Sequence, residues 1–273
     1  MNARSKTQVI LGGTVVTVVI LLAFISLVWT PFNPIEVFPA ERLEGPSVRH
    51  LLGTDRYGRD VFSQIMAGSR ITLVVGLIAA GIGAVIGVPL GIIAGMRRGW
   101  VDQLIVRGAD VLLAFPALLM AIIAGAMVGA STTSAMVAIG IASIPAFIRV
   151  TRAGTVRTMS LAYIEAAQLA GRRGWGIATR HVLPNLWGTI IVQVSITFAL
   201  AILAEAALSF LGLGTPPPEP SWGRMLQSAQ TLLGTDPLLA VWPGAAIAIT
   251  VLGFNVLGDG LRDMLDPTQG DRS

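Results

Sequence analysis

The chain has 273 residues, of which 53% are hydrophobic and 12% are charged. A soluble domain typically carries about 25% charged residues, so this composition is typical of a membrane protein. The formal net charge of +4 is too small to indicate nucleic-acid binding, and the absence of cysteine excludes disulfides and thiolate metal sites. Lys6 is the only lysine and no G-x-x-x-x-G-K motif is present, so P-loop ATP chemistry is excluded.

Several uncharged stretches are long enough to cross a hydrocarbon core, which takes about 20 helical residues. Runs of this length without strand alternation favour helices over barrel strands. The long uncharged stretch from Val111 to Ile148 contains the turn-like sequence "GASTTSA" at 129–135 and predicts a helical hairpin. The sequence therefore predicts a single all-α domain over 1–273, with six spans at about 9–30, 71–96, 104–129, 135–149, 186–207 and 237–258.

The first of these spans could be mistaken for a cleaved signal peptide. Its apolar part exceeds the roughly 7 to 15 residues of a signal-peptide core, and "LVWTPFNP" contains no A-x-A-like cleavage site. We therefore expect it to remain as a membrane anchor.

The basic residues predict the orientation of the six spans. Most Lys and Arg lie in segments that share a side with the N-terminus, and basic residues mark the cytoplasmic side. We therefore expect both termini and the loop at about 150–185 to be cytoplasmic. The basic residues of these segments are Arg4, Lys6, Arg97, Arg98, Arg149, Arg152, Arg157, Arg172, Arg173, Arg180, Arg262 and Arg272.

Glycines recur every four residues in the second span, at Gly83, Gly87, Gly91 and Gly95. Small residues at this spacing share one face of a helix and allow a second helix to approach closely. The partner helix belongs either to this chain or to another subunit.

Four charged residues lie within or at the edges of spans, where charge is costly and usually faces a bundle interior or water. Arg107 and Asp110 are three residues apart, so we expect them to pair with each other. Asp259 lies at the inner end of the last span, where it can reach water. We predict that Glu205 lines a translocation path; an ion pair with Arg107 is the alternative.

A polar segment interrupts this apolar chain at 163–185, "YIEAAQLAGRRGWGIATRHVLPN". Tyr163–Ala170 predicts a helix of about two turns that ends at Gly171. A second short helix is expected around Trp175–Val182, and Pro184 either ends it or starts the next span. Helices this short are marginal in water, so either the protein's own bundle or a partner must hold them.

This segment resembles the EAA loop in the transmembrane subunits of ABC importers. "EAAQLAG" at 165–171 is followed nine residues later by "HVLP" at 181–184, where His181 replaces the family's usual isoleucine. In that family the loop forms a coupling helix that docks in a groove of the ATPase subunit. The resemblance implies an ATPase-coupling role for Glu165, Ala166, Ala167, Gly171, His181, Leu183 and Pro184.

Three further stretches resemble the C-type permease subunit of dipeptide, oligopeptide and nickel importers. They are "LLGTDRYGRDVFSQIMAGSRITL" at 51–73, "LSFLGLGTPPPEPSWGRML" at 208–226 and "FNVLGDGLRDMLDP" at 254–267. In the first, charged residues at 55–60 could pair with one another and hold a tight turn. The second is dense in proline, so it should form a stiff external segment.

The resemblance covers the chain from about residue 10 to 267 and implies a prokaryotic inner-membrane permease that imports di- or oligopeptides. The implied partners are membrane lipid, a homologous second permease, two cytosolic ATPases that use ATP and Mg²⁺, and an extracytoplasmic substrate-binding protein. This chain itself is expected to bind no cofactor and no nucleic acid. Nickel chelates are the alternative substrate, although no His, Cys or carboxylate cluster marks a metal site.

Two other classes of function are less compatible with the sequence. A secondary transporter would use intramembrane carboxylates as proton relays and often contains inverted repeats, which we do not find here. A membrane enzyme is disfavoured because His50 and His181 are expected on opposite sides of the membrane and no H-E-x-x-H or G-x-S-x-G motif is present. We therefore expect no catalytic residues and no metal ligands.

Overall fold

The computed structural model describes residues 3–129 and 131–265, and these contain no β-strand. Ala130 in the predicted turn, Arg272 and the last residues of the 254–267 stretch lie outside the described residues. Five helices are long and apolar enough to cross a membrane: α1 (Ala3–Val28), α2 (Val61–Met96), α5 (Thr132–Met159), α8 (Leu183–Phe210) and α10 (Leu238–Leu265). The predicted all-α fold is confirmed.

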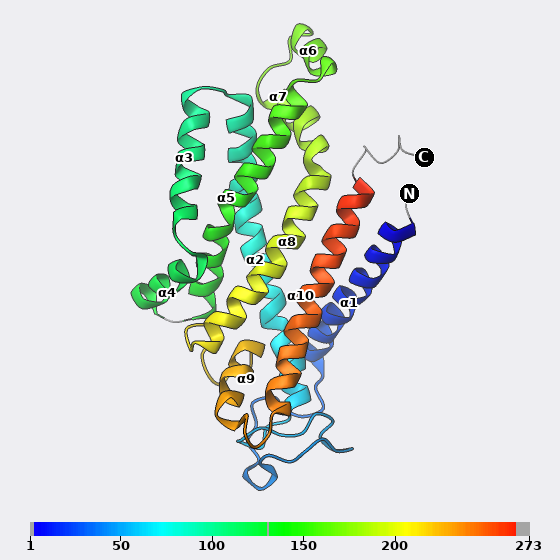
Figure 1. Ribbon diagram of the computed structural model, residues 1–273, viewed down its shortest axis with the longest axis vertical. Helices are drawn as coiled ribbons and strands as arrows, with labels where there is room; N and C mark the ends of the chain where they lie inside the picture. The colour runs from blue at the N-terminus through cyan, green and yellow to red at the C-terminus, as the bar shows by residue number, and fades with distance from the viewer. Residues whose placement is uncertain (1–2, 130, 266–273) are drawn as a thin grey trace.

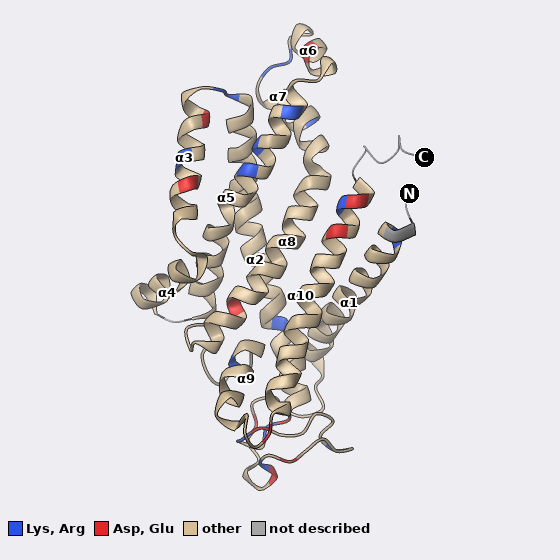
Figure 2. Cartoon of the chain, in the orientation of Figure 1, with Lys and Arg blue, Asp and Glu red and all other residues tan. Residues whose placement is uncertain are grey.

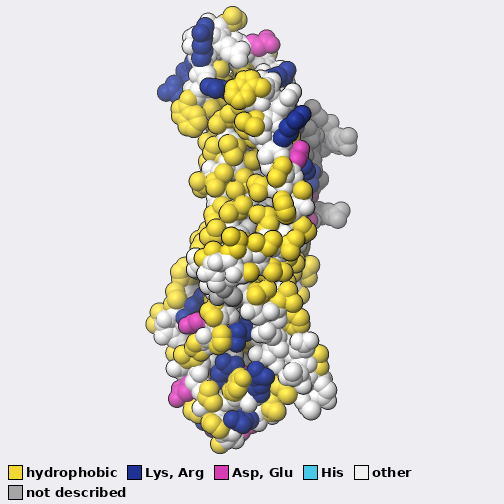
Figure 3. Space-filling view, turned by 90° about the vertical axis from the view of Figure 1, so that its left-hand side faces the viewer, with side chains coloured by type: hydrophobic (Ala, Val, Ile, Leu, Met, Phe, Trp, Pro, Cys, Tyr) yellow, Lys and Arg dark blue, Asp and Glu magenta, His cyan; other side chains and the backbone are white. Residues whose placement is uncertain are grey.

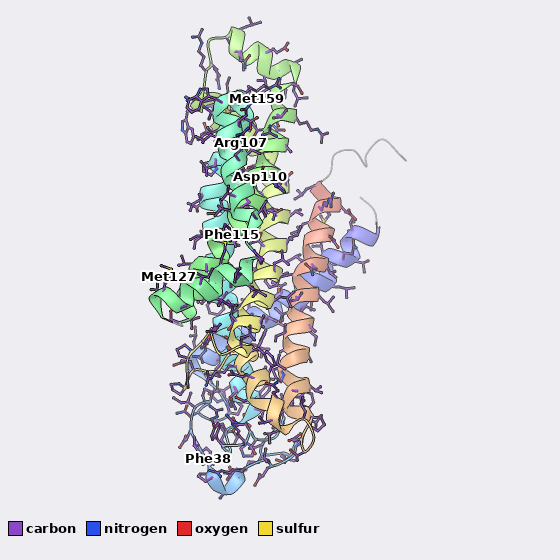
Figure 4. The ribbon with its side chains drawn as sticks, turned by 60° about the vertical axis from the view of Figure 1, so that its left-hand side comes forward. Phe38, Arg107, Asp110, Phe115, Met127 and Met159 are labelled. Carbon is purple, nitrogen blue, oxygen red and sulfur yellow. The ribbon has the colours of Figure 1, made fainter. Side chains whose placement is uncertain are left out.

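The sixth predicted span falls on a pair of shorter helices, α3 (Trp100–Ala114) and α4 (Ala117–Val128), bent by 79°, which form either one broken span or a re-entrant loop. We predicted one span at about 104–129. The break falls at Phe115 and Pro116, and Phe115 has an extended backbone (φ −95°, ψ 126°). A residue before proline is disfavoured in the helical region, which explains where α3 ends. In Figure 4 the labelled Phe115 marks the bend, and Met127 lies near the outer end of α4.

The helices form an elongated bundle in which α1 and α10 run side by side next to a group formed by α2, α5 and α8 (Figure 1). The short helix α6 (Ala162–Leu169) projects from one end, where α1 also begins and α10 ends. The opposite end holds the segment at 29–60 and α9 (Trp222–Ala229). Charged residues gather at these two ends (Figure 2), and hydrophobic side chains cover the middle (Figure 3). This distribution is that of a membrane-spanning bundle.

The glycine row of α2 packs against α5. A Cβ added at Gly87 would lie 2.5 Å from Cβ of Phe147 and 2.8 Å from the carbonyl oxygen of Ile144. At Gly91 an added Cβ would lie 2.6 Å from the carbonyl oxygen of Ile148. The two backbones therefore approach closely, as small residues permit. Packing within the chain, the first of our two readings of this row, is confirmed.

Two ion pairs join α3 to α5 near the α6 end of the bundle. The Arg152 guanidinium donates to both carboxylate oxygens of Asp102 at 2.5 and 2.6 Å, and Arg149 donates to Asp110 at 2.7 Å. The predicted pairing of Arg107 with Asp110 is therefore wrong, because Asp110 faces α5. Both residues are labelled on α3 in Figure 4. Arg149 and Arg152 thus belong to α5, which continues to Met159, beyond the predicted end at about 149.

At the other end, α2 begins ten residues before its predicted start. The Asp60 carboxylate accepts a hydrogen bond from the backbone N–H of Ser63 at 2.7 Å and so caps the helix. The ring of buried His50 lies between this carboxylate, 2.9 Å from Nδ1, and Glu41, 3.2 Å from Nε2. This cluster fastens the segment at 29–60, which reaches the labelled Phe38 in Figure 4, to the start of α2.

Candidate functional site

The projecting helix α6 contains three of the seven predicted coupling residues, Glu165, Ala166 and Ala167. It begins one residue before the predicted start and has Glu165 in its first turn. The positive end of the helix dipole stabilises a carboxylate at this position. Glu165 and Ala166 are exposed, and Ala167 is partly buried. An exposed carboxylate followed by two alanines therefore lies on the projecting helix. The small side chains leave room for another protein to approach the helix closely.

The end of α6 confirms the predicted role of Gly171 as its stop signal. Gly171 has φ +82°, and its N–H donates to the carbonyl of Gln168 at 3.0 Å. The N–H of Arg172 donates to the carbonyl of Ala167 at 3.1 Å. Together these bonds form a Schellman motif, which requires a left-handed residue that glycine supplies without steric cost. The chain therefore turns sharply after α6.

A buried isoleucine that we did not predict as a site residue anchors α6 to the bundle. Ile164 is 0% exposed and belongs to a hydrophobic cluster with Phe147 of α5, Ile92 of α2 and Leu186 of α8. This cluster connects α6 to three long helices. In the sequence it is a single isoleucine within a polar or small stretch, "YIEAAQ", and that pattern alone does not indicate burial.

The chain returns from α6 through a short helical turn, α7 (Trp175–Ile177), and a π-helical turn at Ala178–Val182 that leads directly into α8. Pro184 lies in the first turn of α8 and starts it, one of the two predicted possibilities. Leu183 packs against the same hydrophobic cluster as Ile164. The "HVLP" sequence therefore forms the base from which α6 projects.

His181 and its neighbours join this base to α6. The Asn185 side chain donates to the Tyr163 hydroxyl and to the His181 carbonyl, each at 2.7 Å. The His181 ring centroid lies 6.0 Å from that of Tyr163, and its Nε2 is buried without a hydrogen-bond partner among the described residues. Asn185, which we did not predict as a site residue, thus bridges the two halves of the predicted motif.

The tip of this region combines exposed apolar side chains with arginines. Leu169 is 90% exposed and Trp175 is 73% exposed. An open cleft of about 1040 Å³ lies between α6 and the ends of α2 and α5, lined by residues that include Arg97, Glu165 and Arg172. Exposed large apolar residues grouped in this way mark an interaction surface. We call the exposed face of 163–175 the coupling surface.

Glu205 lies far from this region, near the other end of α8. Its side chain is 1% exposed, and its Oε1 accepts hydrogen bonds from Ser209 Oγ at 2.6 Å and Thr215 Oγ1 at 3.4 Å. The alternative pairing with Arg107 is therefore wrong. Ser209 Oγ in turn accepts from the backbone N–H of Thr215 at 3.0 Å. The carboxylate thus holds the segment after α8 in place; its role in a translocation path stays a prediction.

Substitutions of Glu205 separate these two roles. Glu205→Gln keeps an oxygen acceptor for Ser209, so we expect the variant to retain most transport. Glu205→Ala removes the acceptor of the buried Ser209 and Thr215 hydroxyls, which costs about 1–3 kcal/mol of stability. Thermal unfolding of the purified assembly measures this loss. Strongly reduced transport by Glu205→Gln, with normal thermal stability, would support the translocation-path role.

Comparisons with known proteins agree with this geometry. Residues 87–270 match the family model described as "Binding-protein-dependent transport system inner membrane component". The glutathione transport system permease protein GsiD of Pectobacterium atrosepticum is 44% identical, covering 94% of this chain and 85% of that relative. The dipeptide transport system permease protein DppC of Alkalihalophilus pseudofirmus is 42% identical, covering 97% and 87%.

A solved structure shows the same fold. A chain of the MetNI methionine ABC transporter, in an inward-facing conformation, superposes with a TM-score of 0.61 at 16% sequence identity. The match covers 74% of this chain and 96% of that chain. At this identity the likeness concerns the fold alone.

Proposed function

The chain belongs to the family of binding-protein-dependent transport system inner membrane components, and we propose that it imports short peptides as one permease of an ATP-driven assembly. It is a multi-pass inner-membrane permease of the ABC transporter class. The names of its peptide-transporting relatives support di- or oligopeptides over nickel chelates as its substrate.

The coupling surface carries the proposal. We infer that it docks on a cytosolic ATPase, with Glu165 making polar contacts and with Ala166 and Ala167 allowing close approach. Because Ile164 shares a hydrophobic cluster with residues of α2, α5 and α8, a displacement of α6 would move these helices together. Four further residues fix the angle at which α6 projects toward the ATPase. They are Gly171, His181, Leu183 and Pro184.

The remaining partners follow from the family. We propose a homologous second permease, two ATPases that bind ATP and Mg²⁺, and an extracytoplasmic binding protein that delivers the peptide. ATP binding would close the ATPases and exchange inward-open for outward-open access. The two states differ in free energy only through contacts that differ between them, and the coupling surface is where such contacts would form.

Uptake into proteoliposomes tests this function. The complete assembly, with ATP inside and the binding protein outside, is expected to accumulate a radiolabelled dipeptide, and vesicles without ATP are not. A proton gradient imposed without ATP is the control for a secondary transporter. Uptake driven by that gradient alone, or uptake of a nickel chelate in place of peptides, would contradict the proposal.

A further inference from the structure

A pocket of about 330 Å³ lies at the end of the bundle opposite α6. Its wall is formed by the segment at 29–60, the start of α2, the loop at 217–220 and α9. Apolar side chains such as Ile35, Pro217 and Leu239 alternate there with Arg56, Arg59 and Arg224. Figure 3 shows arginine side chains gathered over this lower end of the molecule. Ligand pockets typically measure about 300–1,000 Å³, so this one suits a small ligand.

One of the three arginines is neutralised inside the protein. Arg59 pairs with Asp55, with Nη2 2.7 Å from Oδ2. The same carboxylate accepts from the backbone N–H of Tyr57 at 2.8 Å and from Gln64 Nε2 at 3.2 Å. Asp55 and Arg59 therefore hold the turn of this loop, as we expected from the charged residues at 55–60. Because Asp55 is already paired with Arg59, it does little to neutralise the other two arginines.

The other two arginines keep their charge free for a ligand. Among the residues that the structure describes, neither Arg56 nor Arg224 forms an ion pair. The Arg56 guanidinium carbon lies 4.7 Å from the centre of the Tyr57 ring, and that of Arg59 lies 5.0 Å from it. Tyr57 is thus flanked by two guanidinium groups. This stacking orients Arg56 and consumes no hydrogen-bond donors.

Arg224 is the second of these two arginines. It lies on α9 and is half-buried, and its Nη1 donates to the carbonyl of Thr215 at 3.4 Å. Burial lowers the pKa of Arg224, and the positive charges of Arg59 and then Arg56 lower it further. An anion in the pocket would offset this repulsion. A carboxylate suits it well, because a guanidinium binds a carboxylate through two parallel hydrogen bonds.

Glu219 also lines the pocket and is exposed, without an ion pair in the described part of the chain. The lining therefore offers two free guanidinium groups and one free carboxylate. We propose that this pocket binds a short zwitterionic peptide, with its carboxylate at Arg56 and Arg224 and its α-ammonium group at Glu219. The inference rests on the proposed function and deepens it, because it assigns a peptide site to this chain.

Direct binding tests the inference without depending on transport. Saturation-transfer NMR is recorded on the assembly purified with its partner subunits but without the binding protein, using alanyl-alanine and its C-terminal amide as probes. We expect transfer to the free acid, much less to the amide, and about tenfold weaker binding by the Arg56→Gln/Arg224→Gln double variant. Arg42→Gln removes an exposed arginine from the same side outside the pocket and is expected to bind normally.

Equal saturation transfer in the double variant and the unsubstituted assembly, or none in either, would overturn the inference. So would equal transfer to the acid and the amide. The arginines could instead contact the binding protein. The double variant would then lose ATPase stimulation by that protein but bind the peptide normally, and this result would also overturn the inference. Failure of the proposed function is a separate result, because it appears as absent ATP-driven peptide uptake by the unsubstituted assembly.

Discussion

Replacing Glu165 by alanine is expected to lower ATP-driven uptake at least about tenfold while the transporter remains inserted in the membrane. Glu165 is an exposed carboxylate of α6, so its loss removes a polar contact to the ATPase without disturbing the bundle. Uptake and ATP hydrolysis are measured on the same proteoliposomes. Glu36→Ala, which removes an exposed carboxylate at the opposite end, serves as the control.

Substitutions at the end of α6 should lower uptake as strongly as substitutions on its exposed face. Gly171→Val forces a β-branched residue into φ +82°, where L-residues pay roughly 1–2 kcal/mol or more, and so changes the angle at which α6 projects. Gly171→Asn is the matched control, because asparagine tolerates this conformation. We expect valine to uncouple uptake from hydrolysis and asparagine to retain most of it. Full uptake by both Glu165→Ala and Gly171→Val would contradict the coupling role.

The largest effect on folding is expected at Gly87. A leucine there cannot avoid the Ile144 carbonyl and the Phe147 side chain, so α2 and α5 must separate. Overpacking of this kind typically costs about 1–3 kcal/mol, and backbone atoms on the facing helix place Gly87→Leu at the upper end. Thermal unfolding and the yield of folded protein from the membrane measure this loss.

Gly81 provides the control on the same helix, since an added Cβ there meets nothing within 4 Å. Gly81→Leu should unfold at nearly the unsubstituted temperature. Alanine substitutions at the two positions distinguish them more clearly, because alanine stabilises a helix interior by about 0.8–1.0 kcal/mol relative to glycine. Gly81→Ala is therefore expected to stabilise the chain and Gly87→Ala to destabilise it. Equal shifts at the two positions would show that α2 does not pack on α5 through this face.

Local signals in the sequence predicted the coupling segment well. The predicted helix at Tyr163–Ala170 and the observed α6 differ by one residue at each end, because a left-handed glycine and a short polar stretch act within one turn. The anchor Ile164 was missed because one isoleucine in a polar stretch has no local signature of burial. Only the folded arrangement of α2, α5 and α8 supplies its partners.

Contacts between distant residues explain the differences elsewhere. Arg149 and Arg152 looked like loop residues, but their partners Asp110 and Asp102 lie 39 and 50 residues earlier, on α3. The pocket at the other end of the bundle could not be predicted from the sequence either. Arg56 and Arg224 are brought together by the packing of α9 beside the start of α2, and no local pattern relates two residues so far apart.

Cross-linking shows whether α6 touches an ATPase subunit. The chain contains no cysteine, so Leu169→Cys and Val48→Cys each introduce one unique attachment point. Both positions are highly exposed, at 90% and 100%, and they lie at opposite ends of the bundle. With a benzophenone-maleimide on each variant, we expect Leu169→Cys to capture the ATPase subunit and Val48→Cys not to. Capture of the ATPase from position 48, or no capture from position 169 in an assembly that contains the ATPase, would show that α6 is not the docking site.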